Sequence, residues 1–183
     1  MTLSVRHQWF MAGAAVALIA GLMIAASVLL SDRAPAVGPG ARAPEFTARQ
    51  LDSAGAVRHL SDYSGRLVLL NVWATWCIPC RAEMPSIQQL HNEFGAKGLH
   101  VVAVSIDEPG QQDAIHSFAA ELGLTFEILH DPTGQIVDTY QMPGVPETFV
   151  IAPDGVIRKT AFATNWYSDE NRQLIRQLLA SDD

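Results

Sequence analysis

The longest uninterrupted apolar segment of the chain lies close to its N-terminus. Residues 10–30 contain neither a charged residue nor a proline. A helix of this length rises about 30 Å, which is the thickness of the hydrocarbon core of a bilayer. We therefore predict a membrane anchor over residues 10–30, with residues 1–9 in the cytoplasm because Arg6 precedes the apolar run. The alternative is a secretory signal that is cleaved near Ala34-Pro35-Ala36, although the apolar part of such signals is usually only about 7–15 residues long.

Beyond residue 44, two hydrophobic periodicities alternate along the chain. Continuous or alternating apolar runs predict strands at residues 46–51, 57–60, 67–73, 101–106, 126–129, 148–152 and 156–161. Apolar positions three and four residues apart predict a helix from the cysteines to Gly95, a second that ends at Gly123, a third over 134–140 and a last one after Ser168. Strands that alternate with helices indicate an α/β sheet, and the two last strands form a hairpin that gives it one antiparallel edge.

Composition completes the domain organisation. Residues 31–44 are rich in proline and glycine and lack apolar periodicity, so we expect a flexible linker between the anchor and a single domain over 45–183. The chain carries a net charge of −7. Because Lys and Arg are not clustered, nothing indicates binding to nucleic acid.

The two cysteines, Cys77 and Cys80, lie in the segment NVWATWCIPCRAEMP. A structural zinc site needs four ligands, and the six histidines of the chain do not show the required spacing. Copper(I) can be held by two thiolates, so a copper carrier remains an alternative. A disulfide that only braces the chain is a poor explanation, because closing so short a loop stabilises a fold least.

A redox-active pair accounts best for the neighbouring residues. A buried strand runs into Cys77, and a helix begins directly after it, so unpaired N–H groups at the helix start stabilise a Cys77 thiolate. Pro79 falls in the first helical turn, where its missing N–H costs little. Cys80 lies one turn along and is expected to point inward.

WATWCIPCRAEMP resembles the active-site segment of thioredoxin-fold proteins, specifically the membrane-tethered TlpA/ResA type of thiol-disulfide oxidoreductase. The segment MPGVPETFV, residues 142–150, is similar to the cis-proline loop and following strand of that family. The resemblance implies a thioredoxin fold with an N-terminal β-hairpin and a central helix-strand insertion, preceded by one transmembrane helix. It covers essentially the whole domain.

The resemblance also implies a role for each matching residue. Cys77 and Cys80 are expected to form the redox-active disulfide, Cys77 as the attacking and Cys80 as the resolving thiol, with Trp76 as an apolar wall beside them. Pro146 is expected to be cis, and the backbone of Val145 to pair with the substrate chain like an added strand. No cofactor or metal is expected.

Deprotonation of Cys80 needs a carboxylate, because Asn71 stands where thioredoxins carry a buried aspartate. The family has a glutamate just after the strand that follows the active-site helix, and the motif match favours Glu108 over Asp107 for that position. Glu83, an acid one turn past Cys80, is the second candidate.

These expectations combine into a membrane-tethered, extracytoplasmic protein-disulfide reductase. We expect a single-pass protein of the bacterial inner membrane with its domain in the periplasm or outside. The resemblance implies a membrane thiol donor of the DsbD or CcdA kind and an oxidised client in cytochrome c or copper-site assembly, bound through a transient mixed disulfide. A peroxiredoxin-like peroxidase is less well supported, because Leu70 and Ala74 stand where its proline and hydroxyl residue are required.

Overall fold

The computed structural model describes residues 37–51 and 55–181, together with residues 9, 13, 16–23 and 25. The chain divides into two units, Met1–Pro35 and Ala36–Asp183. About half of the predicted anchor over residues 10–30 lies outside the described residues, and so do residues 1–8 and 31–36. None of the helices formed by the described residues has the length and hydropathy that a membrane span requires.

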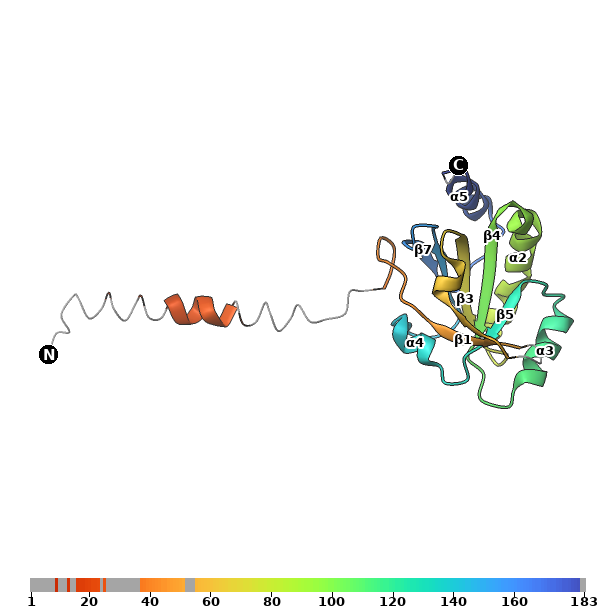
Figure 1. The fold of residues 1–183 in the computed structure, drawn as a ribbon, viewed down its shortest axis with the longest axis horizontal. Coiled ribbons are helices and arrows are strands. Elements are labelled where there is room, and N and C mark those ends of the chain that lie inside the picture. The colour runs from red at the N-terminus through yellow and green to blue at the C-terminus, as the bar shows by residue number, and fades with distance from the viewer. Residues whose placement is uncertain are drawn as a thin grey trace. The chain divides into compact units, whose positions relative to one another are not determined.

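The second unit is built on a sheet whose described strands number seven, in the order β2-β1-β5-β4-β3-β6-β7. Strands β3 and β4 lie between β7 and β5 (Figure 1). The strands are β1 (Thr47–Gln50), β2 (Val57–His59), β3 (Leu67–Trp73), β4 (Leu99–Ser105), β5 (Glu127–His130), β6 (Glu147–Ile151) and β7 (Ile157–Ala161). Strands β3, β4 and β5 are parallel, and every other pairing is antiparallel.

The sheet therefore has antiparallel strands on both sides of its parallel centre, whereas the sequence predicted one antiparallel edge. The N-terminal hairpin, β1 with β2, joins the sheet through β5, where Arg49 pairs with His130. Periodicity predicts the hairpin but does not show which strand of the sheet the hairpin pairs with. The sequence therefore did not predict the second antiparallel edge.

Helices cover both faces of the sheet. They are η1 (Leu60–Tyr63), α2 (Ile78–Phe94), η2 (Gly95–Lys97), α3 (Gln112–Glu121), α4 (Gln135–Thr139) and α5 (Asp169–Ala180). All seven residues of β3 are buried. Leu67, Leu69 and Trp73 pack with α2, α3 and α5 on one face, while Val68, Leu70 and Val72 pack with α4 and η1 on the other. The continuous apolar run of β3 is explained by this two-sided burial.

The structured domain begins earlier than the predicted boundary at residue 45. The N–H groups of Gly40 and Ala43 donate to the carbonyls of Ile157 and Gly155 over 2.8 and 2.9 Å. These backbone bonds attach part of the expected linker to the β6–β7 hairpin. A segment held by its backbone needs no apolar periodicity, so composition alone did not identify it.

Candidate active site

The two cysteines lie where β3 ends and α2 begins. Cys77 has an extended backbone and is the N-cap of α2, and its Sγ accepts a hydrogen bond from the N–H of Cys80 at 3.2 Å. The two residues form a disulfide. The helix continues through Pro85 to Phe94. The strand-to-helix junction therefore places the first sulfur at the positive end of the helix, as predicted.

Exposure does not distinguish the two cysteines in this disulfide form. Cys77 is 4% exposed and Cys80 is 1% exposed. Both cysteines are buried and belong to the same apolar core cluster. The neighbours of Cys77 are open instead, since Trp76 is 65% and Ile78 is 83% exposed. The N-cap position of Cys77, rather than exposure, distinguishes the two sulfurs.

A second loop reaches the same end of the sheet. The Val145–Pro146 peptide bond is cis, as predicted. Glu147 then begins β6 and lies opposite Val72 of β3. Val145 packs against the apolar cluster that contains Cys77 and Cys80. The pairing of β6 with β3 therefore brings the cis-proline loop to the cysteine end of the sheet.

A buried carboxylate lies one turn beyond Cys80. Glu83 is 3% exposed, and its Oε1 accepts hydrogen bonds from Thr148 Oγ1 (2.7 Å), Trp166 Nε1 (2.7 Å) and Asn71 Nδ2 (3.3 Å). Its Oε2 is buried and has no hydrogen-bond partner among the described residues. Burial raises the pKa of Glu83 above its ordinary value, against the lowering effect of its hydrogen bonds. The carboxyl group is thus suited to hold a proton.

This glutamate also borders a cleft. A hollow of about 550 Å³ lies between α2 and the segment after β7, and its lining includes Pro79, Glu83, Ser86 and Thr164. Pro79 is exposed in the first turn of α2, as the sequence predicted. The cleft therefore leads from the start of the active-site helix to Glu83.

The two acidic residues after β4 differ from the expectation. Glu108, the favoured proton acceptor, is exposed, so the apolar surroundings that this role requires are absent. Asp107 is 1% exposed, but its carboxylate accepts from the N–H of Thr75 (3.0 Å), from Thr75 Oγ1 (2.6 Å) and from Ser105 Oγ (2.7 Å). Asp107 therefore fixes the loop that leads to Cys77, and the buried acid on the cysteine helix is Glu83.

Trp166 and Thr148 contact the buried carboxylate of the candidate site, and the sequence did not reveal either of them. Trp166 is 83 residues from Glu83 in the chain, and Thr148 is 65 residues away. Neither residue type suggests an interaction with an acid. Glu83 itself was detectable, because Cys80, Glu83, Met84 and Ile87 follow helical spacing and share the buried face of α2.

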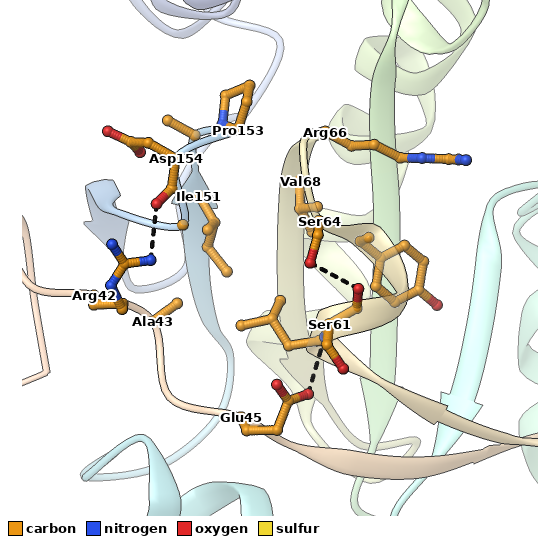
Figure 2. A pocket seen from close by; sticks show the side chains of 14 residues that line it. Arg42, Ala43, Glu45, Ser61, Ser64, Arg66, Val68, Ile151, Pro153 and Asp154 are labelled. Carbon is orange, nitrogen blue, oxygen red and sulfur yellow. Dashed lines mark hydrogen bonds between the residues drawn. The ribbon is translucent and has the colours of Figure 1, made fainter.

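A separate cleft of about 320 Å³ lies at the other end of the sheet, where Val68 of β3 pairs with Ile151 of β6. Its polar groups bond mainly to one another: Arg42 Nη1 donates to the Asp154 carbonyl, and Ser64 Oγ to the Ser61 carbonyl (Figure 2). Neither cysteine lines it. Among the described residues, no group of three or more His, Cys, Asp or Glu side chains is arranged to hold a metal ion.

Comparison with known proteins identifies the family. The family model described as AhpC/TSA matches residues 39–160. The thiol-disulfide oxidoreductase ResA of Oceanobacillus iheyensis is 41% identical over 122 residues, which are 66% of this chain and 62% of that protein. ResA of Geobacillus kaustophilus is 36% identical over 139 residues, 76% of this chain and 78% of that protein. A solved structure from Chlorobium tepidum, assigned as thiol:disulfide interchange protein DsbE, has a TM-score of 0.63 and 31% identity, and covers 79% of this chain and 96% of that one.

A thioredoxin-like α/β fold with a cysteine pair at the start of a helix defines a thiol-disulfide oxidoreductase. The chain belongs to the AhpC/TSA family, and within it to the ResA-type thiol-disulfide oxidoreductases.

Proposed function

We propose that this enzyme reduces disulfide bonds of client proteins outside the cytoplasm, with Cys77 as the attacking thiol, Cys80 as the resolving thiol and Glu83 as the proton acceptor for Cys80. The observation that carries the proposal is the position of Glu83. It is buried one turn after Cys80 on the same side of α2, and one of its oxygens has no partner among the described residues.

The reaction has two steps that balance in electrons and protons. The Cys77 thiolate attacks one sulfur of the client disulfide, a mixed disulfide forms, and the other client sulfur leaves as a thiolate. The thiol proton of Cys80 then moves to Glu83, and Cys80 Sγ attacks Cys77 Sγ. The Cys77–Cys80 disulfide forms, the second client sulfur leaves, and two electrons have passed to the client.

Burial explains why this enzyme needs a proton acceptor. Cys80 is 1% exposed, and burial disfavours the anionic form of a thiol. A carboxylate with a raised pKa accepts a proton near neutral pH more readily than an ordinary surface carboxylate does. Glu83 meets this condition because its own burial raises its pKa, whereas Glu108 is exposed.

The client is bound at the loop that faces the cysteines. The backbone of Val145 pairs with an extended client segment, and exposed Trp76 covers one side of it. Support comes from the position of Val145, which is two residues before the start of β6 and packs against the cluster that holds both cysteines.

Membrane tethering and electron supply complete the proposal. The apolar run over residues 10–30 supports a single-pass anchor with the domain in the periplasm or outside, a compartment in which disulfides persist. In such a compartment the Cys77–Cys80 pair needs a dedicated reductant, and the resemblance to the ResA type suggests a membrane thiol donor of the DsbD or CcdA kind. The same resemblance makes apocytochrome c and copper-site assembly factors the first clients to examine.

The two sulfurs can be followed separately with dithionitrobenzoate, a disulfide that releases a yellow thiolate at each step. The full chain is reduced and mixed with the reagent in a stopped-flow instrument. The first release reports attack by Cys77 and the second reports resolution by Cys80. Glu83→Gln should slow the second release by about 10²–10⁴-fold and leave the first nearly unchanged.

Glu108→Gln is the matched control, since it makes the same change in an exposed acid near the site. We expect it to behave as the wild type in both phases. A slow second release in Glu108→Gln together with a normal one in Glu83→Gln would overturn the assignment to Glu83.

A further inference from the structure

The segment between β7 and α5 sends one side chain into the core beside the cysteine helix. Trp166 is completely buried, and its Nε1 donates to Glu83 Oε1 at 2.7 Å. Its backbone N–H donates to Ser86 Oγ at 2.9 Å, and Ser86 Oγ donates to the Glu83 carbonyl at 2.7 Å. Trp166 is therefore attached to the Glu83 turn of α2 through both its side chain and its backbone.

The three donors to Glu83 Oε1 are not equivalent. An indole N–H can only donate, so Trp166 always favours a negatively charged acceptor. Thr148 Oγ1 donates to Glu83 but also accepts from Asn71 Nδ2 at 2.8 Å, and a hydroxyl can rotate. Trp166 is thus the rigid donor that stabilises the carboxylate and keeps Oε1 occupied.

Among the described residues, no cation is ion-paired with Glu83. Besides Glu83, the titratable groups at the start of α2 and along it are Cys77, Cys80, Arg81, His91 and Glu93, and β6 adds Glu147. Arg81, on the outer face of α2, pairs with Glu121, and Tyr167 lies against Arg172. Hydrogen bonds from the neutral side chains of Thr148 and Trp166 therefore stabilise the charge of Glu83.

We infer that Trp166 is a positioning residue for catalysis: it holds Oε1 of Glu83 so that the second oxygen, Oε2, receives the proton of Cys80. The inference rests on the proposed role of Glu83. Oε2 is buried and without a partner among the described residues, which leaves it as the oxygen that can take a proton. Proton transfer from Cys80 Sγ to Oε2 involves no change in oxidation state.

The test compares two tryptophan-to-phenylalanine variants of the full chain in the dithionitrobenzoate assay. Trp166→Phe keeps a buried aromatic ring and removes the donor. Trp73→Phe is the matched control, because Trp73 is equally buried but its Nε1 has no hydrogen-bond partner among the described residues. Thermal unfolding of each variant shows whether it is folded.

Loss of a donor to the charged form raises the pKa of Glu83, so less carboxylate is present at a given pH. In the pH profile of the rate of the second release, the acid limb should therefore move to higher pH by about one unit in Trp166→Phe. The rate at the plateau on the alkaline side should be nearly retained. Trp73→Phe should leave the limb in place. An unshifted limb in folded Trp166→Phe, or an equal shift in both variants, overturns the inference.

If Trp166→Phe does not fold, a measurement on the wild-type chain tests the inference about Trp166 instead. The indole N–H resonance of Trp166 should titrate with Glu83 in the reduced protein, and this titration should disappear in Glu83→Gln. An indole resonance that does not move with pH would refute the inference. The role of Glu83 and the role of Trp166 can be refuted independently. A normal second release in Glu83→Gln would refute the role of Glu83 as proton acceptor.

Discussion

Thr75→Val is expected to destabilise the protein by breaking a buried hydrogen bond beside the cysteines. Thr75 Oγ1 donates to Asp107 Oδ1 at 2.6 Å, and Asp107 is 1% exposed. Hydrogen bonds to a charged, buried partner are worth about 1.5–3 kcal/mol. Valine keeps the shape of threonine but cannot donate, so we expect a loss of about 2 kcal/mol, which lowers the melting temperature by about 4–8 °C.

A double-mutant cycle isolates this bond. Thr75→Val, Asp107→Asn and the double variant are unfolded by denaturant under oxidising conditions, with Thr75→Ser as the control that keeps the hydroxyl. The coupling energy between Thr75 and Asp107 should be about 1–2 kcal/mol. If Thr75→Val is as stable as Thr75→Ser, or if the coupling is zero, Asp107 does not fix the active-site loop in the way described above.

Three further predictions concern the active-site groups themselves. In the reduced protein, Cys77 should be alkylated faster than Cys80 near pH 6, because only Cys77 caps α2; mass spectrometry of partly alkylated protein shows the order, and faster labelling of Cys80 would reverse the assignment. Burial raises the pKa of Glu83 in the folded protein. As the pH rises from about 4.3 toward this raised pKa, the unfolded chain loses the Glu83 proton before the folded protein does, so the free energy of unfolding falls. Glu83→Gln should therefore gain stability relative to wild type over that pH interval. A difference in the free energy of unfolding between variant and wild type that does not change with pH would contradict the burial argument. Pro146→Thr should accumulate mixed disulfides with a client, because Pro146 lies in the loop that packs through Val145 against the cysteine cluster; unchanged turnover of insulin disulfides would show that the loop does not contact the client.

Local sequence patterns predicted the parts of the fold that depend on local burial. The continuous apolar run of β3, the β6–β7 hairpin and the helix after Cys77 were all expected from periodicity and turn residues. The pairing of β1 with β5 was not, because it joins segments about eighty residues apart and depends on which sheet edge is open.

In the candidate site, too, the sequence predicted the features that depend on local residues and missed those that depend on the tertiary fold. The cysteines, the cis proline and Pro79 follow from short motifs. The choice among Asp107, Glu108 and Glu83 depends on burial at the end of a strand, where periodicity stops, and Asp107 faces inward while Glu108 is exposed. Trp166 reaches Glu83 only through the tertiary fold, so no local pattern points to it.

The most direct test of the central claim is the capture of a defined disulfide by a single cysteine of the full chain. Reduced Cys80→Ser and Cys77→Ser variants are mixed with insulin, and covalent adducts are mapped by mass spectrometry before and after reduction. We predict a mixed disulfide at Cys77 in Cys80→Ser that is lost on reduction, and little or none at Cys80 in Cys77→Ser. An equal or greater yield through Cys80, or no adduct in either variant, would contradict the mechanism.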